Sequence, residues 1–128
     1  MTRPEIYAKS QLDKLGNALI FLCQKISPYT QVSKTHLLKL IFIIEEISVK
    51  KFGIPFFNLR FDVWKLGPVS KDLYVELTDE PNLLSEYITK EAIEKDKFII
   101  CPKHEFSDDE FSDNEMALLE EVAERFKY

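Results

Sequence analysis

The sequence predicts a mostly α-helical fold with a small β-hairpin or short strands, or an α+β fold, arranged around one apolar helix over residues 34–52. Apolar residues recur three and four positions apart in long segments, as in amphipathic helices. Only short stretches alternate apolar and polar residues as strands do. With 128 residues, 45% of them hydrophobic and 30% charged, the chain has the size and composition of one globular domain spanning residues 1–128.

The first predicted helix covers residues 9–26. Its apolar positions fall on one face because they are three and four residues apart: Leu12, Leu15, Leu19, Leu22 and Ile26. Pro28 follows and cannot continue a helix. We therefore expect this helix to end just before Pro28.

The second predicted helix runs from about Lys34 to Phe52. Ser33 is a suitable N-cap, Gly53 suits the helix end, and Pro55 prevents continuation. Its isoleucines also suit a strand, but its length and its end signals favour a helix. The middle is apolar nearly all round: Leu37, Leu38, Leu40, Ile41, Phe42, Ile43, Ile44 and Ile47. Such a helix should be central and covered on several sides.

The centre of the chain changes character after Gly53. Residues 61–65 alternate apolar and polar side chains and predict a half-buried strand. Residues 66–69 should then turn the chain into a short helix, in which Val69, Leu73 and Leu77 lie four apart and which ends near Thr78.

The last third predicts a hairpin and a helix. Short apolar stretches flank the charged residues 94–97 and favour a small β-hairpin between Tyr87 and Cys101. Ser112 and Glu115 have the spacing of a capping box, in which each side chain accepts from an amide at the helix start. The buried face of that helix should comprise Met116, Leu119, Val122, Ala123 and Phe126.

Charge and composition restrict the possible partners. The net charge is −5, and the basic residues are scattered, so we expect no direct binding of nucleic acid. The start of the chain lacks a signal-peptide core, and its two cysteines lie far apart, which indicates the reducing cytoplasm. The most apolar stretch, residues 37–47, is too short for a membrane span.

The sequence offers little for catalysis or for metal binding. Cys101 and His104 are three residues apart, but only Cys23 and His36 could complete a four-ligand zinc site. The acidic residues from Asp108 to Glu115 lack the glycine and spacing of a calcium-binding loop and suit the start of a helix instead. We expect no enzymatic activity, no cofactor and no metal.

Three segments together resemble the Panacea domain family, which includes SocA-like antitoxins and phage-associated GepA-like proteins. They are a Lys-Leu-rich helix at residues 38–42, the linker 52–55, and an aromatic-x-x-Gly-Pro-Val turn at residues 64–69 that precedes Leu73, Tyr74 and Leu77. Residues 118–122 are similar to the closing helix of the family. The similarity extends over about residues 12–126, and its specific part is residues 38–77. Whether the chain lacks a C-terminal extension that family members carry stays open.

The resemblance implies a mostly helical antitoxin that neutralises a co-encoded toxin by direct binding. The alternative is a proteolytic adaptor, or a chaperone-like protein, that delivers its partner to a Clp-type protease. The residues expected to form or support the partner surface are Lys39, Trp64, Lys65, Gly67, Pro68, Val69 and Tyr74. Trp64 suits either core packing or a binding anchor, and Gly67 and Pro68 suit equally a purely connecting role. The oligomeric state and the identity of the toxin stay open.

Overall fold

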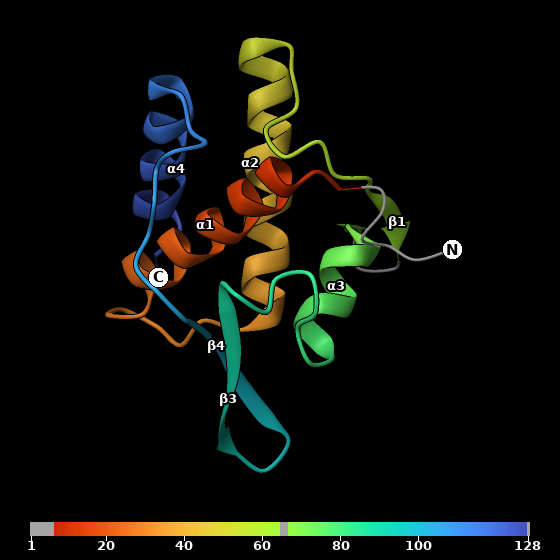
Figure 1. Ribbon diagram of the computed structural model, residues 1–128, viewed down its shortest axis with the longest axis vertical. Coiled ribbons are helices and arrows are strands. Elements are labelled where there is room, and N and C mark those ends of the chain that lie inside the picture. Colours follow the sequence, from red (N-terminus) through yellow and green to blue (C-terminus); the bar gives the residue numbers. More distant parts are fainter. Residues whose placement is uncertain (1–6, 65–66, 128) are drawn as a thin grey trace.

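The computed structural model describes residues 7–64 and 67–127, and these contain four helices and two antiparallel hairpins (Figure 1). The helices are α1 (Lys9–Ile26), α2 (Lys34–Phe52), α3 (Lys71–Thr78) and α4 (Asp113–Arg125). The strands are β1 (Asp62–Trp64), β2 (Gly67–Val69), β3 (Ile88–Glu94) and β4 (Lys97–Pro102). The predicted mostly helical class with small hairpins is confirmed.

Helix α1 has the predicted bounds but is buried on more than the one predicted face. Every residue from Leu15 to Cys23 is buried. The physical reason is that α1 contacts α4 and both strands of the β3–β4 hairpin, and it also crosses in front of α2 (Figure 1). The three-and-four spacing identified one apolar face, but residues on the other faces, Ile20 and Phe21 among them, are covered as well.

Helix α2 has the predicted ends. Its N-cap Ser33 accepts a hydrogen bond from the amide of His36 at 3.2 Å, and Gly53 closes it in the left-handed conformation with φ of 74°. The helix contacts α3, α4 and β2, as expected of a central helix. One stripe of α2 remains exposed and includes Lys39, Glu46 and Val49.

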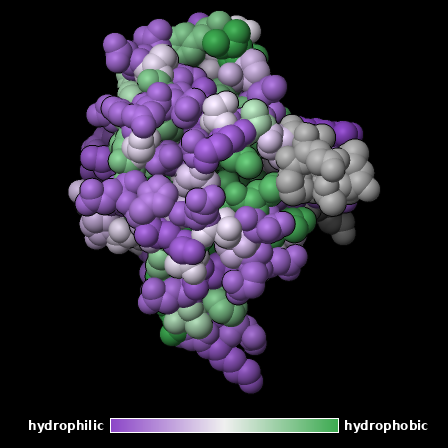
Figure 2. Space-filling model, in the orientation of Figure 1, coloured by the Kyte–Doolittle hydropathy of each residue, from purple (hydrophilic) through white to green (hydrophobic). Residues whose placement is uncertain are grey.

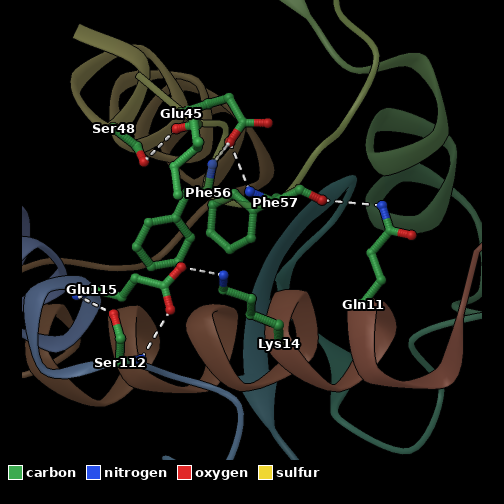
Figure 3. A network of polar contacts seen from close by, with 9 residues as sticks. Gln11, Lys14, Glu45, Ser48, Phe56, Phe57, Ser112 and Glu115 are labelled. Carbon is green, nitrogen blue, oxygen red and sulfur yellow. Dashed lines mark hydrogen bonds and ion pairs between the residues drawn. The ribbon is translucent and has the colours of Figure 1, made fainter. Parts of the chain in front are cut away.

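A buried glutamate holds the loop that follows α2 (Figure 3). Glu45 is only 7% exposed, and its Oε1 accepts hydrogen bonds from the amides of Phe56 at 2.6 Å and Phe57 at 2.7 Å. Its Oε2 accepts from the amide of Leu59 at 3.1 Å. From the side of α1, Gln11 donates to the carbonyl of Phe57 at 3.0 Å. The loop is thus fixed to both helices before it enters β1.

A second buried glutamate holds the segment after α3 in the same manner. Glu76 is 8% exposed, and its Oε1 accepts from the amides of Asn82 and Leu84, both at 2.9 Å. Buried carboxylates are costly unless they are hydrogen-bonded. Both glutamates meet that condition by accepting from backbone amides of the loop that follows their own helix.

Helix α4 begins with the predicted capping box. Ser112 accepts from the amide of Glu115 at 3.2 Å, and Glu115 accepts from the amide of Ser112 at 2.9 Å. The Glu115 carboxylate also pairs with Lys14 of α1, whose ammonium lies 4.7 Å from the centre of the Phe56 ring. Figure 3 shows this link between α1, α4 and the loop after α2.

The predicted β3–β4 hairpin is confirmed and projects away from the helices (Figure 1). Its base is tied down, because the amide of Ile100 donates to the carbonyl of Val32 at 2.9 Å. Figure 2 shows the hairpin as a narrow protrusion with a hydrophilic end. That end carries Glu94, Lys95, Asp96 and Lys97.

The expectation that Val69 belongs to the short helix is wrong. Val69 is the last residue of β2, and α3 begins at Lys71. Ser70 is the N-cap, with extended backbone, and its side chain accepts from the amide of Leu73 at 3.4 Å. Gly67 and Pro68, expected in a turn, are also part of the paired strand β2. An N-cap residue must leave the helical conformation, so Ser70 separates Val69 from the helix.

Candidate functional site

The β1–β2 hairpin contains most of the residues predicted to bind a partner. Asp62 pairs with Val69, Val63 with Pro68, and Trp64 with Gly67. Gly67 has φ of 121°, and a Cβ atom at this position would meet nothing within 4 Å. The glycine is therefore required by its backbone conformation and not by lack of space. Pro68 lacks an amide proton and is tolerated because β2 is an edge strand.

One face of this hairpin presents apolar side chains to solvent. Val63 is 88% exposed, and the opposite residue, Pro68, is also exposed. Directly opposite residues in an antiparallel pair share a face, so the two side chains form one small apolar surface. We call Val63 and Pro68 the hairpin patch.

The hairpin patch rests on a rigid support. Strand β2 contacts α2, and Phe61, just before β1, packs edge-on against Phe42 of α2 with ring centroids 5.4 Å apart. On the other side, α3 is anchored in the core by Leu73 and Leu77, which are 1% and 2% exposed. Both ends of the hairpin are therefore attached to packed helices.

The predicted partner residues fall into two locations. Gly67, Pro68 and Val69 lie in β2, and Tyr74 lies close by in α3, half-buried. Lys39 lines a separate shallow hollow on α2 with Thr35 and His36. The backbone of Trp64 pairs in β1, whereas its side chain and the whole of Lys65 lie outside the described residues.

The sequence analysis did not identify two residues of this region, Lys34 beside Tyr74 and Val63 in the hairpin patch. Lys34 lies 4.9 Å from the centre of the Tyr74 ring, a contact between α2 and α3 for which the sequence contains no local signal. The sequence predicted a half-buried strand over residues 61–65 but did not indicate that Val63 is exposed. In a hairpin of three paired residues per strand, alternation is too short to show which face is buried.

The residues considered for metal binding do not converge. Cys101 donates to Glu91 at 3.5 Å, His104 contacts the carbonyl of Glu105 at 2.8 Å, and His36 contacts the carbonyl of Phe126 at 3.2 Å. In the part of the chain that the structure describes, no group of three or more metal-binding side chains is arranged around a common point. Among the same residues, no helix is long and apolar enough to cross a bilayer.

Both cysteines are free thiols that resist ionisation. Burial, and then the nearby Cys101, raises the pKa of Cys23 from 9.0 to about 12. Burial and the neighbouring Glu91 also raise the pKa of Cys101. Because the thiolate is the nucleophilic form, neither side chain is activated for covalent catalysis at neutral pH.

The Cys23 pKa predicts a loss of stability in alkali. Because the folded state holds the proton more tightly than the unfolded chain, the contribution of Cys23 is complete below pH 9.0 and is lost as the pH rises towards about 12. The free energy of unfolding should fall by about 1.4 kcal/mol per pH unit in this range through Cys23 alone. Urea unfolding of the wild type and of Cys23→Ala from neutral to alkaline pH measures the difference. Cys101→Ala should keep most of the slope, and equal slopes in the wild type and Cys23→Ala would contradict the assignment.

A family model described as "Antitoxin SocA-like, Panacea domain" matches residues 37–128. The matched segment contains most of α2, both hairpins, α3 and α4, and thus the whole hairpin patch. Helix α1 precedes the match but packs against α4 and the β3–β4 hairpin within it. No curated protein and no solved structure matches the chain.

Proposed function

The chain belongs to the family of SocA-like antitoxins with the Panacea domain, and we propose that it neutralises a toxin protein encoded beside it by binding that toxin directly. The family supports an antitoxin role and a toxin as partner. The observation that carries the proposal is the hairpin patch, in which Val63 is 88% exposed. An apolar side chain in this position is stabilised when a partner covers it.

The strands β1 and β2 suit binding because packed helices hold them in place. Pro68 restricts the backbone of β2, and the Phe42–Phe61 contact fixes the entry into β1. A surface that is held in its bound conformation loses little entropy on binding. Covering the Val63 side chain would contribute about 2 kcal/mol to the affinity. We propose that Tyr74 of α3 and Lys65, which follows Trp64 in the sequence, extend the contact surface.

The first experiment tests the function itself. The product of the neighbouring gene is expressed alone and together with this chain, and growth and co-purification are measured. An antitoxin should restore growth and form a stable complex. A neighbour that is harmless and does not bind would refute the proposal.

The second experiment tests the hairpin patch. Val63→Glu should weaken binding of the toxin about 30-fold, because it removes about 2 kcal/mol of apolar contact. Val49→Glu is the matched control, since Val49 is 49% exposed on α2, outside the hairpin. It should change the affinity by less than about threefold. Calorimetric titration measures both.

Equal effects of the two valine variants would place the interface elsewhere. Tyr74→Ala and Lys65→Glu provide an independent check, since both should weaken binding in a folded protein. If neither substitution changes the affinity, the contact surface lies elsewhere.

The lifetime of the toxin in cells distinguishes simple inhibition from delivery to a protease. The half-life of the toxin is measured in cells with and without this chain, and in cells that lack the Clp-type protease. Inhibition leaves the half-life unchanged or longer. A half-life that this chain shortens only when the protease is present would replace inhibition by the adaptor alternative.

A further inference from the structure

Two lysines from distant segments meet at the C-terminal end of α3. Lys34 of α2 donates to the side-chain oxygen of Thr78 at 3.3 Å, and Lys90 of β3 donates to the backbone carbonyl of Thr78. Figure 1 shows the end of α3 on the side towards which the β3–β4 hairpin projects. Three elements thus bring two ammonium groups to one residue.

Each ammonium also lies over an aromatic ring. Lys34 is 4.9 Å from the centre of the Tyr74 ring, and Lys90 is 4.9 Å from that of Phe98. Phe98 is 48% exposed. The rings and the bonds to Thr78 hold the two charges in fixed positions. We call Lys34, Tyr74, Thr78, Lys90 and Phe98 the lysine–aromatic surface.

Within the part of the chain that the structure describes, no ion pair neutralises the positive charge of this surface. Among residues 7–64 and 67–127, the ion pairs involve other basic residues, and none joins Lys34 or Lys90 to a carboxylate. Asp79 and Glu80 follow Thr78 directly, yet neither forms such a pair. The negative end of the α3 dipole offsets part of the charge, but two ammonium groups close together still repel each other.

We propose that the lysine–aromatic surface binds an acidic segment of the partner protein. Carboxylates of that segment would contact Lys34 and Lys90, and an apolar side chain between them would cover Phe98. The argument is charge complementarity, because this is a positive site on a chain with net charge −5. The inference deepens the proposed function, since it specifies the chemistry of a segment of the toxin.

A synthetic peptide tests the surface without the toxin. The probe is a short fluorescein-labelled peptide that alternates glutamate and phenylalanine, and fluorescence anisotropy at low salt measures its binding to the whole chain. The wild type should bind this peptide more tightly than a peptide with lysine in place of glutamate, and about 0.5 M salt should weaken the binding. General attraction cannot produce this preference, because the net charge of the chain repels acidic peptides.

Two double variants with equal net charge provide the comparison. Lys34→Gln with Lys90→Gln removes the paired charges while the glutamine amides can still donate to Thr78. Lys50→Gln with Lys95→Gln removes two exposed lysines elsewhere. We expect the first to weaken peptide binding about tenfold and the second less than about twofold. Equal urea midpoints for both variants verify that the first remains folded.

Equal affinities of the two double variants, or a wild type that prefers the lysine peptide, would overturn the inference. A harmless neighbouring gene product would refute the proposed antitoxin function and leave the peptide result intact. Conversely, a toxin that the Lys34→Gln, Lys90→Gln variant binds as tightly as the wild type does would refute only the inference.

Discussion

Replacing Glu45 by glutamine is expected to lower the free energy of unfolding by about 3 kcal/mol. The carboxylate accepts from three backbone amides, two on Oε1 and one on Oε2. Glutamine keeps one acceptor oxygen for Phe56 and Phe57, but its amide nitrogen then faces the amide of Leu59. A buried donor opposite another donor loses its hydrogen bond and its solvation.

The neighbouring glutamate provides a matched control. Glu46 is exposed and pairs with Lys50 at 3.5 Å along the same helix, so Glu46→Gln should cost no more than about 0.5 kcal/mol. Urea unfolding of both variants measures the difference. Similar urea midpoints for Glu45→Gln and Glu46→Gln would show that the three hydrogen bonds from backbone amides to Glu45 contribute little to stability.

Glu45 should also affect binding, because its loop leads into β1. Hydrogen exchange at Phe56, Phe57 and Leu59 should accelerate in Glu45→Gln at temperatures where the protein is still folded. Binding of the toxin should weaken in the same variant, although Glu45 is buried and cannot contact a partner. Unchanged hydrogen exchange at these three amides would show that Glu45 does not hold the loop that leads into the hairpin.

Local signals in the sequence predicted the helices and the larger hairpin well. Ser33 and Gly53 at the ends of α2, and Ser112 with Glu115 at the start of α4, act within a few residues of the chain. Hydrogen bonds of this kind depend on local backbone geometry, so their residue types are visible in the sequence. The error at Val69 arose because a four-residue spacing continued across the N-cap Ser70 by coincidence.

The candidate site was less predictable, because its geometry depends on contacts between distant segments. Nothing near Lys34 in the sequence indicates Tyr74 or Thr78, which lie forty or more positions later. In the sequence, Glu45 looks like any other charged residue of a helix. Only the structure shows that the amides of Phe56 and Phe57 donate hydrogen bonds to it. Tertiary packing, and not local preference, determines these pairs.

Gly16 is another residue whose role depends on a tertiary contact that the sequence does not reveal. It lies inside α1 between Leu15 and Asn17, where glycine weakens a helix by about 1 kcal/mol relative to alanine. The structure supplies the reason for its presence. A Cβ atom at Gly16 would lie 2.3 Å from Cγ of Tyr87 and 2.6 Å from both Cδ atoms, well inside van der Waals contact.

Replacing Gly16 by alanine is therefore expected to destabilise the protein by about 3 kcal/mol, although alanine favours helices. The Tyr87 ring cannot easily move away, because it is 7% exposed and its hydroxyl donates to Asp13 one turn earlier in α1. The clash would push α1 away from the start of β3, where the core is closed by Ile88. Urea unfolding measures the loss.

A double-mutant cycle isolates the contact between Gly16 and Tyr87. Tyr87→Ala alone leaves a cavity and destabilises the protein by about 3 kcal/mol, but in that background Gly16→Ala should be neutral or stabilising, because the ring is gone. Gly53→Ala is the matched control. Its cost of about 1 kcal/mol comes from φ of 74° with no atom within 4 Å, so Tyr87→Ala should not change it. If Gly16→Ala costs the same with and without the Tyr87 ring, the close approach of α1 to Tyr87 is not what requires glycine.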